Sequence, residues 1–298
     1  MPTACPWIPH VTADGSYTFY STEFGETFHS NQGAKAEAFE KFVMATQLLR
    51  VAAETGTVRI LDVCYGLGYN TAAALTAIEA AVPGTRVEVM ALELDGTVPQ
   101  GALQGACLES WPPSVQTALV ALAQAHQYGD DRHQLQLHLG DARQTLPTIV
   151  AQGWQADAIF LDPFSPRRCP QLWTVEFLAW VARTLSPQGI LATYCRAAAV
   201  RSALQSAGLG LGTLPLAHPK APHHWAEGTI ASREAAVLTP LSPLEQEHLQ
   251  TRAAIPYRDP TLTDTAPLIL QRRQQEQQRS TRESTTQWRK RWGIEANC

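Results

Sequence analysis

Residues 58–71, VRILDVCYGLGYNT, decide the fold that we expect for this chain. The run at 58–63 is apolar enough for a strand buried on both faces, and Asp62 stands close to its end. Gly66 and Gly68 allow a sharp turn and a close approach of the backbone to a ligand, because neither has a Cβ atom. A helical pattern follows at once. The stretch therefore predicts a strand, a tight turn and a helix whose N-terminus faces a nucleotide-sized site.

The glycine turn is more typical of an S-adenosylmethionine site than of a dinucleotide site. The dinucleotide fingerprint has a third glycine where this chain has Thr71, and it does not require an acid such as Asp62. A carboxylate at the strand end can accept a hydrogen bond from the ammonium group of the methionyl tail. An ordinary glycine turn in an α/β domain is the alternative interpretation.

The ends of the next two predicted strands carry acids as well. RVEVMALELD at 86–95 places Glu93 beside the glycine turn if the two strands are parallel neighbours, where it can chelate both ribose hydroxyls. A third, alternating strand ends in Gly140 and Asp141. Asp141 can face the adenine amino group or cap the helix that follows, and the residues alone leave both open.

ADAIFLDPFSP at 156–166 indicates the chemistry that this site performs. In methylation of an amine, the nucleophile must be neutral, with its lone pair aimed at the methyl group. The Asp162 carboxylate and the Pro163 carbonyl can accept from the N–H groups of the amine, and Phe164 can stack on the ring that carries it. This chemistry requires no metal. The alternative is a proline-stiffened loop with a capping aspartate.

Five strand and helix alternations within about 150 residues predict a doubly wound, mostly parallel Rossmann-like α/β sheet. We expect three parts. Residues 1–54 form an N-terminal arm and one covering helix at 34–54, residues 55–238 form the methyltransferase domain, and residues 239–298 form a proline-rich connection and a basic tail. After Gly212 we expect a strand pair, GTIASR with AAVL.

The N-terminal arm offers candidate substrate contacts. We expect its aromatic residues to pack on the core, and Glu26 and His29, together with Thr27 and Ser30, to face a cleft. Lys220 stands in the histidine-containing segment HPKAPHH, which has no carboxylate or cysteine partners and is broken by prolines. We interpret that segment as a surface loop that binds no metal.

Composition favours a globular, cytoplasmic protein. Hydrophobic residues make up 45% of the 298 residues and charged residues 17%, and no apolar run is long enough to span a bilayer. The six cysteines form no CxxC pair, which indicates reduced thiols.

Charge is unevenly distributed along the chain. The formal net charge is −4, yet residues 271–292 hold seven basic side chains against two acidic ones. This tail indicates either a solvated segment, helical or disordered, or contact with a polyanion. We expect its removal after Leu270 to leave the fold and the cofactor site intact.

Taken together, these motifs resemble the methyltransferase family that completes 5-methylaminomethyl-2-thiouridine at the wobble position of tRNA. The resemblance covers about residues 17–235. It rests on ETFHS, DVCYGLGYN, the strand ending in Glu93, GDARQTL, and above all FLDPFSPRRCPQLW followed by GILATYCRAAAVRSALQSAGL.

The resemblance implies an enzyme that uses S-adenosylmethionine to methylate the 5-aminomethyl group of the wobble uridine. It implies a cofactor site formed by Asp62, Gly66, Gly68 and Glu93, with Asp141 near adenine and Asp162 with Phe164 at the amine. Cys64 and Tyr65 depart from the small residues that the family has there.

The FAD-dependent oxidase domain fused to many members of that family is absent from this sequence. That absence implies a stand-alone form and a separate enzyme that supplies the aminomethyl uridine. The basic tail and the region of Lys220 are the candidates for contact with the tRNA anticodon arm.

Two other functions fit parts of the pattern. Aminopropyl transfer, as in spermidine synthases, uses a similar glycine turn, but its loop usually offers a second acid where this chain has Pro163 and Phe164. A non-catalytic RNA-binding protein on a methyltransferase core is the other, and the intact acids Asp62 and Glu93 argue against it.

Overall fold

A computed structural model describes residues 7–103, 106–214 and 227–294. The chain divides into two compact units. Unit 1 comprises Met1–Phe164 and Thr184–Ala192, and unit 2 comprises Ser165–Arg183 and Thr193–Cys298. These units are defined by internal packing and leave the three-part division at 54 and 238 as a prediction.

The N-terminal arm of unit 1 is a small antiparallel sheet. It consists of β1 (Pro9–Val11), β2 (Tyr17–Ser21) and β3 (Glu26–Thr27), with β2 in the centre. Phe19 on β2 is only 1% exposed, and Trp7 stacks on it. The aromatic residues therefore anchor the arm, as their number in this polar segment predicts.

The expected single helix at 34–54 is wrong in detail, because the segment is broken into three pieces. They are α1 (Ala34–Ala38), the π-helical η1 (Phe39–Met44) and α2 (Leu48–Thr55). The Thr46 hydroxyl donates to the Phe42 carbonyl over 2.7 Å, and Gln47 adopts a left-handed φ of 54°. A side chain that bonds back to the preceding turn competes with the regular ladder, and here the helix ends at that point.

The central sheet of unit 1 is mostly parallel, as predicted. Its strand order is β9-β8-β4-β5-β7-β6, and only the edge strand β6 runs antiparallel to its neighbour. The strands are β4 (Thr57–Val63), β5 (Arg86–Glu93), β6 (Gln127–Gly129), β7 (His133–Leu139), β8 (Ala156–Leu161) and β9 (Leu185–Thr193). The predicted α/β fold is thus confirmed.

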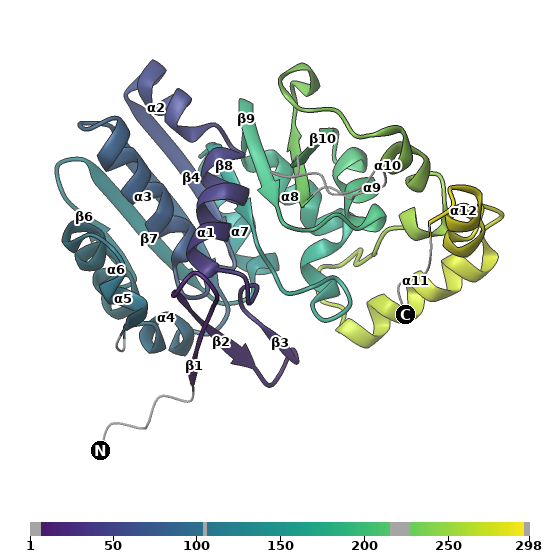
Figure 1. The fold of residues 1–298 in the computed structure, drawn as a ribbon, viewed down its shortest axis with the longest axis horizontal. Helices are drawn as coiled ribbons and strands as arrows, with labels where there is room; N and C mark the ends of the chain where they lie inside the picture. Colours follow the sequence, from purple (N-terminus) through teal and green to yellow (C-terminus); the bar gives the residue numbers. More distant parts are fainter. Residues whose placement is uncertain (1–6, 104–105, 215–226, 295–298) are drawn as a thin grey trace. The chain divides into compact units, whose positions relative to one another are not determined.

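Helices cover the sheet of unit 1 on both faces. On one face α2, α3 (Tyr69–Ala81) and α6 (Pro113–Ala125) contact one another, with α4 (Thr97–Gly101) and α5 (Ala106–Glu109) beside α6 (Figure 1). The chain then reverses its direction across the sheet, so a right-handed crossover places α7 (Ala142–Ala151) on the opposite face. This winding brings the carboxyl ends of β8, β4 and β5 together at one edge.

Unit 2 is mainly helical and contains one strand pair. Its helices are η2 (Pro170–Trp173), α8 (Val175–Thr184), α9 (Ala198–Ser206), η3 (Ala235–Val237), α10 (Pro243–His248), η4 (Arg252–Ala254), α11 (Ala266–Arg279) and α12 (Thr285–Arg291). The strands β10 (Gly210–Leu214) and β11 (Gly228–Ser232) pair antiparallel. β11 matches the predicted GTIASR, but its predicted partner AAVL is a 3₁₀ turn. Gly210 leaves room for Ala235 there, because a Cβ at 210 would overlap the Ala235 side chain.

The basic tail is folded into unit 2 and is not separable from it. Ile269 on α11 and Trp288 on α12 are fully buried, and Trp288 stacks on the ring of His248 at 4.6 Å between centroids. The Arg273 guanidinium donates to the carbonyls of Ile255 and Ala253 over 2.7 and 3.0 Å. Truncation after Leu270 would remove Trp288 and the Arg273 contacts, so this packing argues against the expectation that the fold survives it.

Across the described ranges, none of the helices has the length and apolar character needed to cross a bilayer.

Candidate active site

Three acids stand at the carboxyl ends of adjacent parallel strands in unit 1. Asp62 is the penultimate residue of β4, Glu93 ends β5, and Asp162 directly follows β8. β4 lies between the other two strands and pairs with both. Ligands of open α/β sheets bind at this edge, so the sequence prediction that these three residues meet there agrees with the topology.

Glu93 is anchored by backbone groups on both sides. Its Oε2 accepts from the Gly66 N–H over 2.8 Å, and its Oε1 accepts from the Asp95 N–H over 2.9 Å. Burial raises the pKa of Glu93, against the lowering effect of these two bonds. An ionised carboxylate has about four acceptor positions, so two remain for hydroxyl donors such as those of a ribose.

Asp62 is fully buried and only half satisfied. Its Oδ2 accepts from the Thr71 hydroxyl over 2.6 Å, while Oδ1 has no hydrogen-bond partner among the described residues. Burial raises the pKa of Asp62 to about 7, although the bonds from Thr71 oppose this effect. A buried acceptor without a partner is costly, so a cationic or N–H group of a ligand that bonded this atom would remove that cost.

The glycine turn is shaped by the two residues that the sequence singled out. Gly66 and Gly68 have positive φ values of 55° and 82°. A Cβ atom would lie 3.3 Å from Cδ1 of Phe28 at position 66, and 2.5 Å from the Tyr65 hydroxyl at position 68. The Tyr65 side chain therefore packs against the turn and is 4% exposed. The related family has a small residue at this position.

These features fit S-adenosylmethionine. The unpartnered Asp62 Oδ1 can accept from its ammonium group, the free acceptor positions of Glu93 suit its ribose hydroxyls, and the glycine turn leaves room for the chain between them. These roles of the individual residues stay predictions.

Asp141 caps a helix and also forms an ion pair. It is the N-cap of α7 and accepts from the Arg143 N–H over 2.9 Å. The Arg143 guanidinium also binds the carboxylate, with Nη2 to Oδ2 at 2.7 Å. The capping alternative is thus realised, and the predicted contact with adenine would have to share this carboxylate with Arg143.

Asp162 is fixed by a side chain that the sequence analysis did not name. Asn70 Nδ2 donates to Asp162 Oδ2 over 2.9 Å, and the Asp162 N–H donates to the Val63 carbonyl. Burial raises the pKa of Asp162 well above its ordinary value, and the negative charge of Glu37 raises it further. The carboxylate therefore lies in surroundings that would favour a cationic partner.

Phe164 is packed against the N-terminal arm. Its ring stacks on Phe24 with centroids 4.4 Å apart and meets Phe28 edge-on at 4.9 Å. One face of the ring is thus covered by Phe24. Phe24 and Phe28 of the arm thus contact Phe164. From the sequence, these aromatic residues were expected only to pack on the core.

His29 follows strand β3 of the arm, and Glu37 lies on α1. The His29 backbone N–H donates to the Thr18 hydroxyl, and its ring packs 5.0 Å from Tyr69. Burial lowers the pKa of His29 to about 4, so the imidazole is neutral at pH 7. Glu37 pairs with Lys41 at 2.7 Å, and although burial acts in the opposite direction, Lys41 lowers the pKa of Glu37.

Two of the predicted substrate contacts carry less information. Glu26 lies on β3, half-buried, opposite Ser21 of β2. Lys220 falls outside the described residues. The roles assigned to Glu26, His29 and Lys220 stay predictions.

The residues that the sequence analysis missed stand directly after the glycine turn. Asn70 and Thr71 lie in the first turn of α3, and each bonds one of the strand-end acids. The signal was available, because two polar residues that begin an otherwise Ala- and Leu-rich buried helix require partners.

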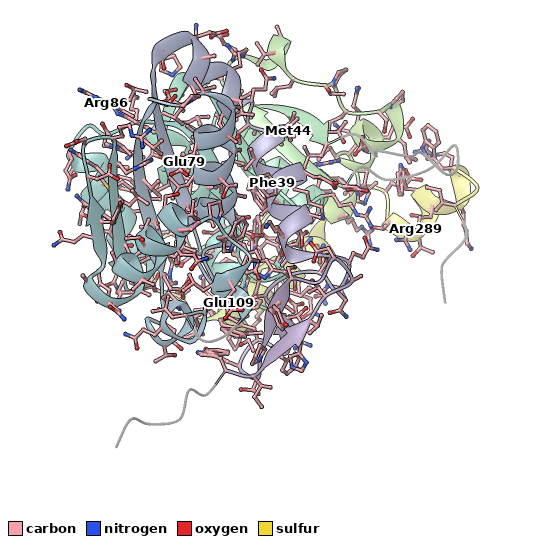
Figure 2. All side chains as sticks on the ribbon, turned by 60° about the vertical axis from the view of Figure 1, so that its left-hand side comes forward. Phe39, Met44, Glu79, Arg86, Glu109 and Arg289 are labelled. Carbon is pink, nitrogen blue, oxygen red and sulfur yellow. The ribbon has the colours of Figure 1, made fainter. Side chains whose placement is uncertain are left out.

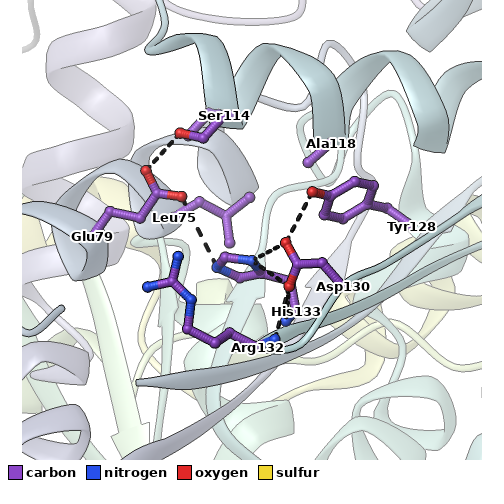
Figure 3. Close-up of a pocket in the computed structure, with 9 residues that line it drawn as sticks. Leu75, Glu79, Ser114, Ala118, Tyr128, Asp130, Arg132 and His133 are labelled. Carbon is purple, nitrogen blue, oxygen red and sulfur yellow. Dashed lines mark hydrogen bonds and ion pairs between the residues drawn. The ribbon is translucent and has the colours of Figure 1, made fainter. Parts of the chain in front are cut away.

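A small pocket in unit 1 involves a different set of side chains (Figure 3). It lies between α3, α6 and the β6–β7 turn and is lined by Glu79, Ser114, Asp130 and His133, among others. Asp130 accepts from His133 Nδ1 over 2.9 Å, and Ser114 donates to Glu79 over 2.7 Å. These groups bond one another, and Ser114 and Asp130 are exposed, so the pocket is a polar network at the surface of unit 1.

Comparison with known proteins agrees with this geometry. A family described as S-adenosyl-L-methionine-dependent methyltransferase matches residues 106–222. The crystal structure of MnmC2 from Aquifex aeolicus superposes with a TM-score of 0.79 at 30% identity, over 94% of this chain and 87% of that one.

Curated relatives are similar over most of this chain. The tRNA 5-methylaminomethyl-2-thiouridine biosynthesis bifunctional protein MnmC of Cupriavidus necator is 31% identical over 234 residues, which are 72% of this chain and 33% of that protein. An uncharacterized protein of Methanocaldococcus jannaschii is 26% identical over 277 residues, 90% of this chain and 72% of its own length. The chain spans about one third of the length of the bifunctional relative.

The α/β fold, the glycine turn and the strand-end acids define an S-adenosylmethionine-dependent methyltransferase. Within that class, the extent of the match to the Aquifex structure places the chain more narrowly. It belongs to the MnmC2 family of methyltransferases.

Proposed function

We propose that this enzyme methylates the 5-aminomethyl group of the wobble uridine in tRNA and produces 5-methylaminomethyl-uridine, with or without the 2-thio group. Two relatives support the substrate: the bifunctional protein is named for this tRNA modification, and the Aquifex protein is an MnmC2. The observation that carries the proposal is the acidic, aromatic site around Asp162, which suits a small cationic amine attached to a ring.

Asp162 has the properties of an amine-binding acid. Asn70 occupies one oxygen, Oδ2, and the other oxygen keeps acceptor capacity for an N–H group of the substrate. The raised pKa of Asp162 follows from burial and from the like charge of Glu37, and a bound ammonium group would offset both effects.

The reaction needs a neutral amine and a stable position for it. When bound, S-adenosylmethionine supplies a methyl group on a positively charged sulfur. The amine nitrogen forms the new N–CH₃ bond while the C–S bond breaks, and the positive charge passes from sulfur to nitrogen. Asp162 would hold the N–H groups and stabilise this charge, and the aromatic cluster of Phe164 would lie beside the base.

The test uses purified protein, labelled S-adenosylmethionine and two tRNA samples. One sample carries a free aminomethyl group on the wobble uridine, and the other is an unmodified transcript of the same tRNA. We expect label only in the first, located by mass spectrometry in the wobble nucleoside. Label in both samples, or in a different nucleoside, would contradict the substrate assignment.

A further inference from the structure

Acidic and basic residues divide unequally between the two units. Unit 1 contains 17 Asp and Glu against 7 Lys and Arg, whereas unit 2 contains 10 against 16. The basic excess therefore belongs to unit 2 as a whole, and the 23 residues from Gln271 to Gly293 contribute much of it. Only some of those cations are available to a ligand.

Three arginines of this segment are used within unit 2. Arg272 binds Asp264 at 2.7 Å, and Arg273 donates to backbone carbonyls and lies 4.5 Å from the centre of the Tyr257 ring. Arg291 binds both Glu247 and Glu283, at 2.7 and 2.9 Å. These contacts hold α11 and α12 in place, so they stabilise the unit and leave little charge for a partner.

Four other cations of the same segment are not used in such contacts. They are exposed, and within the described residues no ion pair engages their side chains: Arg279, Arg282, Arg289 and Lys290. Arg289 can be seen at the surface of α12 in Figure 2. The backbone that carries them is fixed, because Arg252 donates to the Arg282 carbonyl over 2.9 Å and its own carbonyl accepts from Gln277.

A row of glutamines lies on the outer face of α11. Gln271, Gln274, Gln275 and Gln278 are all exposed, and their spacing of three and four residues puts them on one side of the helix. Arg272, Arg273 and Gln277 are half-buried on the other side. A glutamine side chain both donates and accepts, so this row can bind phosphate oxygens and ribose hydroxyls without adding charge.

We propose that these four glutamines and four cations, the Gln/Arg face, bind the sugar–phosphate backbone of the RNA substrate. The inference rests on the proposed function for the identity of that RNA, and it deepens it by naming the residues that hold the substrate outside the reacting centre. The cations displace counterions from phosphates, and the amides contact the 2′-hydroxyls that distinguish RNA from DNA. The competing explanation for these cations is that basic residues near the C-terminal ends of α11 and α12 stabilise the helices and are otherwise only solvated.

The first experiment measures binding of a tRNA anticodon arm as a function of salt. Arg289→Gln/Lys290→Gln in the full chain removes two cations of the Gln/Arg face. Arg86→Gln/Arg132→Gln removes two exposed cations of unit 1 and is the matched control; Arg86 is visible in Figure 2. We expect the slope of log affinity against log salt to fall by about 2 in the first variant, about 1 per lost cation, and to stay unchanged in the second.

The second experiment separates hydrogen bonding from charge. Gln274→Ala/Gln278→Ala should weaken binding of the RNA arm, leave the salt slope unchanged, and reduce the preference for RNA over a DNA arm of the same sequence.

In the first experiment, an equal loss of salt slope in Arg289→Gln/Lys290→Gln and in the Arg86→Gln/Arg132→Gln control would mean nonspecific attraction and overturn the proposal. Wild-type slopes in both variants would overturn it as well.

Methyl transfer distinguishes failure of this inference from failure of the proposed function. If wild type methylates the aminomethyl tRNA but the face variants bind it normally, the face is wrong and the function stands. If no tRNA is methylated while the variants still lose RNA affinity and slope as expected, the face stands and the substrate assignment fails.

Discussion

The two units of the molecule use their charged residues in opposite ways. In unit 1, the strand-end acids Asp62 and Glu93 are buried and Asp162 is half-buried, and removal from water raises the pKa of each. In unit 2, the buried acid Glu245 forms a 2.9 Å ion pair with Arg201, and the pKa of Glu245 is lowered despite its burial. The difference separates two roles of charged residues. An acid that is paired with a cation of the protein stabilises the fold, whereas an acid with a raised pKa and no such cation can bind a cationic ligand.

The largest effect expected concerns packing in unit 2. Trp288→Ala removes a fully buried side chain and should lower the free energy of unfolding by about 3–5 kcal/mol. Because every predicted cofactor residue lies in unit 1, the affinity for S-adenosylmethionine should stay unchanged at temperatures where the variant is folded. Thermal denaturation and calorimetric titration measure the two quantities. Arg289→Ala, at an exposed neighbouring position, is the control. A large loss of cofactor affinity in Trp288→Ala would contradict the expectation that cofactor binding depends on unit 1 alone.

The second prediction tests the amine-binding acid. Asp162→Ala should lower turnover at saturating cofactor about 10²-fold, which corresponds to about 2.7 kcal/mol, with little change in cofactor affinity. Asp162→Asn should fall between alanine and wild type, because the amide keeps one acceptor oxygen but no negative charge. The exposed acid variant Asp131→Ala is the matched control. A kinetically normal Asp162→Ala enzyme would leave Asp162 as a residue that only shapes the turn.

Glu93 provides the third test, on cofactor binding alone. Glu93→Ala should weaken binding of S-adenosylmethionine by about 1.5–3 kcal/mol, because two ribose hydroxyls lose a charged acceptor. The Gly66 N–H would lose its acceptor in the same variant. Glu93→Gln restores an acceptor without the charge and should recover part of the affinity. Calorimetry at fixed ionic strength measures both, and unchanged affinity in the alanine variant would remove Glu93 from the site.

The smallest effect is a pH dependence. The pKa of Asp62 is about 7 in the free protein, and a bound cation favours its ionised form, so the pKa falls on binding. Affinity for the cofactor should therefore be complete above about pH 7 and fall as the pH drops below it, by at most about tenfold per unit. Asp62→Asn should bind more weakly at pH 8 and show a flatter profile between pH 5.5 and 7.5. An equally steep profile in that variant would assign the titration to another group.

The sequence revealed the parts of the site that depend on local pattern. Strand-end acids can be found because a buried strand, a turn and a helix leave a readable signal, and parallel strands bring their carboxyl ends to one edge. Asp62, Glu93 and Asp162 were found in this way. The polar residues at the start of α3 indicate that partners are needed, but the partner of Asn70 is 92 positions away, and no local pattern identifies it as Asp162.

The same limit explains the errors in the fold. β10 is a short strand with glycines at 210 and 212, so its composition gave no strand signal, and only its pairing with β11 defines it. The tail was interpreted from its charge, whereas Trp288 and Ile269 fix it by burial that depends on distant elements. Long-range packing overrode local propensity in both places.

The contact between the N-terminal arm and the glycine turn also has a consequence for the evolution of the family. A Cβ atom at position 66 would lie 3.3 Å from the Phe28 ring, and that ring also meets Phe164. A side chain at position 66 would therefore require the Phe28 ring to shift by a few tenths of an ångström, although 38 residues separate the two positions. Among relatives, a side chain at the first glycine of the turn should occur together with a smaller residue at the position of Phe28, and an alignment should show the two positions varying as a pair.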